Sequence, residues 1–106
     1  MPNFIIVYHG GKTSMSPEEG QKLMASWRAW MAGMGSAVVN PGWPVGASRT
    51  INSDRSITEN GGPNPISGVT VIAADSLEAA TELVKPCPHL DIGGSIELAP
   101  ALDMPM

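Results

Sequence analysis

Residues 68–89, which read GVTVIAADSLEAATELVKPCPH, contain the most clearly marked strand and helix of the chain. Residues 69–74 form a short apolar run rich in β-branched side chains, which is typical of a buried strand. Asp75 or Ser76 is suited to cap a helix that follows, and Pro86 predicts where that helix ends. We therefore expect a buried strand that leads directly into a helix, and the rest of the fold is placed against this unit.

The start of the chain predicts a second strand and helix of the same kind. Residues 4–8 are apolar throughout and are followed by His9 and a pair of glycines, which predicts a strand that ends in a turn. The sequence SPEE at residues 16–19 combines a capping serine, a proline at the first helical position and a glutamate three residues after the cap. Apolar residues then recur at helical spacing, so we expect a helix over residues 17–34, with Gly35 in the left-handed conformation at its end.

The middle of the chain predicts shorter strands. Residues 37–39 are suited to a brief strand, which the NPG sequence at residues 40–42 interrupts, so that Trp43 is expected in an irregular segment of a bulged or broken strand. Residues 49–52 and 56–59 alternate enough to predict a small hairpin.

The remaining segments complete a single domain that spans residues 1–106. Residues 60–65 (NGGPNP) and 89–94 are expected to be loops, residues 95–98 a final strand, and residues 100–106 a C-terminal arm. The order of elements predicts an α+β fold of the ferredoxin-like, split βαβ type (β-α-β-β-α-β), with both helices on one face of the sheet.

Both predicted central strands are apolar on nearly every position, although two helices can cover only one face of a sheet. Charged residues make up only 15% of the chain, below the roughly 25% of typical soluble domains. We therefore expect a homodimer in which two sheets pack face to face about a twofold axis. The alternative is that the inner strands are simply short and apolar.

The charge and the cysteine content exclude several classes of protein. A net charge of -4 without a basic cluster argues against a nucleic acid or an anionic membrane as a partner. Cys87 is the single cysteine, so neither an internal disulfide nor a structural zinc site is expected, and we interpret Cys87 as a buried apolar residue. No glycine pair matches a nucleotide-binding loop, and we expect no cofactor. No signal sequence or long apolar run is present, which predicts a cytoplasmic location.

Several motifs together resemble those of the YCII-related proteins, in particular the small bacterial branch that is related to the DGPF proteins. These motifs are the opening FIIVYHGG, the SPEE helix start with the tryptophans that follow, the NPG and NPISG segments, ADSLEAATEL, and CPHL followed by GGSIEL. The resemblance covers almost the whole chain and implies the dimeric α+β barrel fold. It also implies an active site built on a His and Asp pair. The chain departs from the DGPF pattern, because NGGPNP stands where Asp-Gly-Pro-Phe is expected.

His9 is the leading candidate for acid–base chemistry, because it follows a strand at a glycine turn and histidine titrates near neutral pH. A carboxylate such as Asp75 or Asp91 would have to orient it. The resulting hypothesis is a cofactor-independent enzyme that performs proton transfer, elimination or isomerisation on a small molecule, with His9 and Asp75 as catalytic residues. In the alternative interpretation, His9 binds a loop carbonyl and the protein is a non-catalytic small-molecule-binding or regulatory partner.

Four further residues are candidates for binding a small organic ligand: Trp30, Trp43, Arg49 and His89. Trp43 suits a pocket wall or an interface, whereas Trp30 also has the spacing of a core residue. Arg49 is suited to bind a carboxylate or to form an ordinary ion pair on a strand. His89 is suited either to a ligand or to the last carbonyls of the preceding helix. We expect the ligand in a cleft between the sheet, the first helix and the loops.

Overall fold

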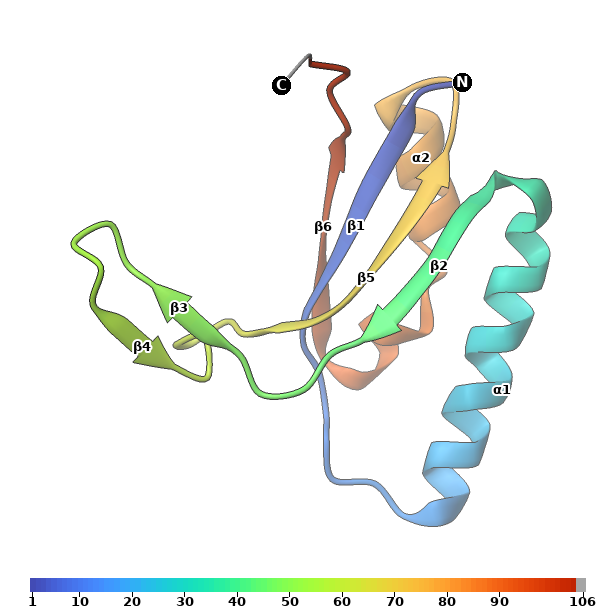
Figure 1. The fold of residues 1–106 in the computed structure, drawn as a ribbon. Helices are drawn as coiled ribbons and strands as arrows, with labels where there is room; N and C mark the ends of the chain where they lie inside the picture. The colour runs from blue at the N-terminus through green and yellow to red at the C-terminus, as the bar shows by residue number, and fades with distance from the viewer. Residues whose placement is uncertain (105–106) are drawn as a thin grey trace.

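The computed structural model describes residues 1–104 and has the mixed α+β composition that the sequence predicts. Helix α1 follows the first strand and helix α2 follows the fifth, and a short 3-10 helix (η1 or η2) comes after each of them (Figure 1). In chain order the elements are β1 (Asn3–Gly10), α1 (Pro17–Met34), η1 (Gly35–Ala37), β2 (Val38–Pro44), β3 (Arg49–Ile51), β4 (Ile57–Glu59), β5 (Ile66–Ala73), α2 (Leu77–Val84), η2 (Pro88–Ile92) and β6 (Gly94–Pro100).

Four strands form the main sheet in the order β2-β5-β1-β6, and each neighbouring pair is antiparallel. This order is compatible with the predicted ferredoxin-like arrangement, in which the first and third long strands lie at the centre. Within the described residues, strands β3 and β4 pair only with each other and form the predicted hairpin as a separate two-stranded sheet.

The core lies between one face of the main sheet and the two helices. Phe4, Ile6 and Tyr8 alternate along β1 and belong to one buried cluster with Trp30 of α1 and Val84 of α2. Since the intervening positions of a strand point to the opposite face, the sheet has a second face formed by other side chains. Within residues 1–104, neither helix contributes to that second face, which we call the open face.

Helix α1 has the predicted bounds because its first turn is capped by local side chains. Ser16 accepts a hydrogen bond from the backbone amide of Glu19, and the Glu19 carboxylate accepts one from the amide of Ser16. Gly35 has a positive φ of 55°, but its ψ of -125° lies outside the left-handed helical region, so the predicted left-handed cap is wrong. Its amide instead donates to the carbonyls of Ala32 and Met31, and a 3-10 turn follows.

Strand β2 is longer than predicted and includes Trp43, which pairs with Val69. The NPG sequence does not end the strand, because β2 lies at the edge of the sheet and the irregularity is absorbed there as two shifts in register. At Gly42 the backbones of β2 and β5 approach so closely that a Cβ atom on residue 42 would lie 1.7 Å from the carbonyl oxygen of Val69. Only glycine fits at this position.

The C-terminal part also differs from the prediction. Residues 88–92 form η2 where a loop was expected, and Gly93 ends it in the left-handed conformation. Strand β6 then runs through Pro100, because its whole length pairs with β1. The predicted arm begins within this strand, and residues 105 and 106 of that arm lie outside the described part of the chain.

Candidate functional site

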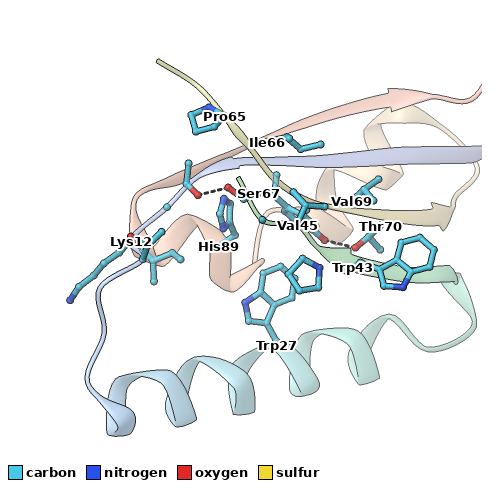
Figure 2. A pocket seen from close by; sticks show the side chains of 18 of the residues that line it. Lys12, Trp27, Trp43, Val45, Pro65, Ile66, Ser67, Val69, Thr70 and His89 are labelled. Carbon is cyan, nitrogen blue, oxygen red and sulfur yellow. Dashed lines mark hydrogen bonds between the residues drawn. The ribbon is translucent and has the colours of Figure 1, made fainter. Parts of the chain in front are cut away.

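A cavity of about 830 Å³ lies between the main sheet, the middle of α1 and the loops that follow β1 and β2 (Figure 2). Four apolar side chains of α1 face it, namely Leu23, Met24, Trp27 and Met31. Their helical spacing predicts a core-facing stripe, but the helix stands away from the sheet here and the stripe borders open space. Cavities of this size and apolar character are typical of sites for small organic molecules.

His89 lines this cavity and is 5% exposed. Figure 2 shows that its ring and that of Trp27 project from opposite sides into the space between the sheet and α1. The Nε2 atom of His89 lies 2.9 Å from the carbonyl oxygen of His9. Because a carbonyl oxygen only accepts, Nε2 carries the hydrogen, and the neutral ring then has an unprotonated Nδ1. Within residues 1–104, Nδ1 has no hydrogen-bond partner, so it is available as an acceptor or a base.

Two glycines leave the space that the His89 ring occupies. A Cβ atom at Gly94 would lie 2.1 Å from Nε2, and one at Gly11 would lie 2.7 Å from Cε1. The ring of Tyr8 completes this enclosure with an edge-to-face contact at a centroid distance of 5.5 Å. Close packing on several sides fixes the orientation of the imidazole, which is a requirement for an acid–base group.

Tyr8 forms part of the wall beside His89. Its hydroxyl donates to Oγ1 of Thr70 at 2.8 Å, and Thr70 in turn donates to the carbonyl of Pro41 at 3.0 Å. Burial raises the pKa of Tyr8 well above its ordinary value, so the phenol is neutral at physiological pH. Since the hydroxyl proton is committed to Thr70, the Tyr8 oxygen can act toward a ligand only as an acceptor.

The charged groups at the cavity are cationic. Lys12 and Arg28 are among the lining residues, whereas no carboxylate is among those that the structure describes. The ammonium of Lys12 is already paired with Glu19 at 2.8 Å. Arg28 forms no ion pair within residues 1–104. The electrostatic character of the cavity therefore favours a neutral or an anionic ligand.

His9 lies outside this cavity, although it was the leading candidate from the sequence. Its Nδ1 is 3.2 Å from the carbonyl oxygen of Asn64, and its Nε2 is 3.2 Å from Oε1 of Glu97. The carboxylate beside His9 is thus Glu97, brought there by the pairing of β6 with β1. Asp75 follows the β5 residue that pairs with Asn3, at the opposite end of β1, so the structure does not bring Asp75 and His9 together.

The three other predicted ligand-binding residues are placed differently from one another. Trp43 lines the cavity and is 65% exposed, as expected for a residue at its mouth. Trp30 is buried in the core, where its Nε1 donates to the carbonyl of Leu83 at 2.9 Å. Arg49 lies on the separate hairpin and pairs with Glu59 at 3.2 Å. Neither Trp30 nor Arg49 lines the cavity.

The sequence patterns assigned none of Tyr8, Trp27, Arg28 and Thr70 to a site. A signal for Trp27 and Arg28 exists in the sequence, since both lie near Leu23 and Met31 on one side of a helix. No comparable signal links Tyr8 to Thr70, because they are 62 positions apart and meet only through strand pairing.

Cys87 and the acidic residues offer no further site. Cys87 is buried, and burial raises its pKa to about 11, so the thiolate is scarce at neutral pH. Among residues 1–104, no three histidine, cysteine or acidic side chains are grouped as metal ligands. Over the same residues, neither α1 nor α2 combines the length and the apolar character needed to cross a membrane.

Comparisons with known proteins do not assign the chain to a family. No model of a known protein family matches it. No curated protein sequence matches it significantly. The resemblance to the YCII-related proteins therefore rests on the sequence motifs alone.

Proposed function

We propose that the protein binds a small aromatic carboxylate in the cavity beneath α1 and that His89 exchanges a proton with it. The observation that carries this proposal is the hydrogen bond from His89 Nε2 to the carbonyl of His9, which leaves Nδ1 as a base inside a mostly apolar cavity. A base at the wall of such a cavity lies within reach of a bound molecule.

The ligand class follows from the lining residues. Trp27, Tyr8 and Trp43 provide aromatic surface for a planar ring. Arg28 provides a guanidinium that pairs with no carboxylate of the described residues, and guanidinium groups bind carboxylates through paired hydrogen bonds. An aromatic acid satisfies both requirements, whereas a cationic ligand would be repelled by the guanidinium of Arg28.

The reaction class is proton transfer without a cofactor, of which isomerisation and elimination are extensions. In the simplest step, Nδ1 of His89 removes a proton from the carbon beside a carbonyl group, and the electron pair of that bond forms the enolate. The imidazolium then returns the proton to the enolate oxygen or carbon, which gives the enol or regenerates the keto form. The step is balanced, because one proton leaves the substrate and one is returned to it, and the proton held on the imidazolium exchanges with solvent in between.

The structure favours His89 over His9 for this role. Both ring nitrogens of His9 already face protein oxygens, whereas Nδ1 of His89 has no partner within residues 1–104. His9 is also outside the cavity. The predicted catalytic pair of His9 and Asp75 would require these residues to be close together, but they lie at opposite ends of β1. The contact of His9 with the carbonyl of Asn64 fits the alternative interpretation, in which His9 binds a loop carbonyl.

Binding is tested with phenylacetate and phenylacetamide, which have the same shape and differ in charge. Tryptophan fluorescence is the readout, because two of the three tryptophans line the cavity. We expect phenylacetate to bind at least about tenfold more tightly than the amide, and Arg28→Gln to remove this difference. Arg55→Gln, on the hairpin, is the matched control. Equal affinity for the two compounds in the wild type would refute the proposed ligand class.

Catalysis is tested with phenylpyruvate, which combines an aromatic ring, a carboxylate and exchangeable protons beside a carbonyl. We expect the wild type to accelerate deuterium exchange at that carbon in D₂O. His89→Gln should lower the rate at least about a hundredfold, the usual contribution of an acid–base group, and His9→Gln should not. Binding of phenylacetate without any exchange of phenylpyruvate would instead support the non-catalytic, ligand-binding alternative.

We also propose that the protein is a cytoplasmic homodimer of the dimeric α+β barrel type, as the likeness to YCII-related proteins implies. The open face supports this, since its central positions Ile5, Val7, Val69 and Val71 are apolar and only partly buried in one chain. The single unpaired cysteine is consistent with a reducing compartment. Light scattering at micromolar concentration tests the dimer, and a mass of one chain would refute it.

A further inference from the structure

The hairpin formed by β3 and β4 stands apart from the rest of the molecule. It belongs to a sheet of its own and projects from the body on the side away from α1 (Figure 1). Ile51 and Ile57 face each other across the hairpin and are 73% and 56% exposed. This pair of isoleucines beside the turn of a projecting element is an apolar surface that residues 1–104 leave uncovered.

The hairpin is held in a defined shape by its own polar side chains. Nδ2 of Asn52 donates to the carbonyl of Ser56 at 3.2 Å and to Oγ1 of Thr58 at 3.1 Å. The carboxylate of Asp54 accepts from the amide of Ser56 at 2.9 Å, which closes the turn. A hairpin of two short strands is marginally stable in water by itself, so a preformed one that exposes isoleucines is suited to pack on another surface.

The size of the exposed surface indicates what kind of partner covers it. A compact monomer of this mass exposes about 5,700 Å², so the 7251 Å² of this chain is roughly 1,500 Å² in excess. The radius of gyration is 15.1 Å, compared with about 13 Å for a compact domain of this length. A stable interface buries about 800 Å² on each partner, so the excess is large enough for an interface with a second folded protein.

The base of the hairpin connects this surface to the open face of the main sheet. Asn64 lies in the loop after β4, and its carbonyl contacts His9, which also reaches Glu97 on β6. His9 and Glu97 are diagonal neighbours on the strands β1 and β6, in line with Val7 on the open face. The hairpin therefore leaves the body beside the face on which we have proposed that a second copy packs.

We propose that the β3–β4 hairpin is an arm that packs Ile51 and Ile57 against a second copy of this chain. The inference rests on the homodimer proposed above. In a twofold dimer each chain presents the same surface to the other, so the two arms are exchanged and each adds apolar contact outside the sheet-to-sheet interface.

Sedimentation velocity over a dilution series tests the arm. The double variant Ile51→Thr with Ile57→Thr keeps β-branched side chains in the strands but removes apolar surface at four positions of the dimer. We expect it to weaken dimerisation by more than about a hundredfold. Thr50→Ala, whose side chain lies on the other face of the hairpin, is the matched control and should dimerise like the wild type.

A second variant separates the arm from the sheet interface. Val7→Asp places a charge on the open face and should abolish the dimer of the wild type. If Val7→Asp is monomeric while the double isoleucine variant dimerises with wild-type affinity, the arm is refuted and the sheet-to-sheet dimer stands. A wild type that stays monomeric up to 100 micromolar, about the highest concentration used in such experiments, would refute both. Far-UV circular dichroism confirms that each variant is folded.

Discussion

The imidazole of His89 donates a hydrogen bond over 2.9 Å to the backbone carbonyl of His9. The two histidines of the chain thus meet at the end of β1, yet their rings have different surroundings. The ring of His89 lies in the cavity, whereas that of His9 contacts Asn64 and Glu97 outside it. One histidine therefore positions the other through its backbone, and only His89 is placed to meet a ligand in the cavity.

Tyr8 provides a test of the buried side of the cavity, because it is the only tyrosine. Its pKa is raised by burial, so the folded protein should show little tyrosinate absorbance at 295 nm at pH 10, where an exposed tyrosine is half ionised. In denaturant the same absorbance should rise with a midpoint near 10. A half-ionised tyrosine in the folded protein at pH 10 would contradict the buried hydrogen bond to Thr70.

The raised pKa of Tyr8 also predicts how the stability of the fold depends on pH. Above about pH 10 the unfolded chain loses the Tyr8 proton that the folded chain retains, so stability falls as the pH rises. Cys87 acts in the same direction, since its pKa of about 11 in the fold exceeds that of an exposed thiol. Urea denaturation at pH 8 and pH 10.5 should show the lower midpoint at the higher pH.

Gly94→Ala tests the space reserved for the His89 ring. The added Cβ would lie 2.1 Å from Nε2, so the ring has to move, and we expect a loss of about 1–3 kcal/mol in the free energy of unfolding. Chemical denaturation measures this loss. Gly20→Ala is the control, because open space surrounds Gly20 in α1 and alanine there should stabilise the helix by roughly 0.5–1 kcal/mol. Equal stability of Gly94→Ala and the wild type would contradict the described position of His89.

Trp30 and Trp27 are three residues apart in α1, but we expect their substitutions to have different effects. Trp30→Phe loses the hydrogen bond to Leu83 and should lower the free energy of unfolding by about 1–3 kcal/mol, with little effect on the affinity for phenylacetate. Trp27→Ala removes a wall of the cavity and should weaken phenylacetate binding about tenfold or more. Thermal melts measure the effect on stability, and fluorescence titrations measure the effect on binding. A Trp30→Phe variant with impaired phenylacetate binding would show that Trp30 belongs to the site.

Much of the fold was predictable because its signals are local. The capping box at Ser16 and Glu19 and the helical spacing that follows fix α1 from a few adjacent residues. The hairpin around Ser53–Arg55 and the strand before Ser76 were predicted for the same reason. The bulged strand after η1 was predicted from residue 37, but its extension to Pro44 was not, since an edge position tolerates Pro41 and Gly42. The 3-10 helix η2 was not predicted either, because the turn at Pro88 depends on what surrounds it.

The sequence by itself determined the helices, the hairpin and the apolar character of both central strands, because capping, turn and periodicity signals act over a few residues. Only the tertiary structure decided which histidine meets the cavity, that Glu97 lies beside His9, and that α1 directs Trp27 to the cavity and Trp30 to the core. These relationships depend on strand pairing and on how far the helix stands from the sheet. They join residues up to 88 positions apart, which no local pattern in the chain encodes.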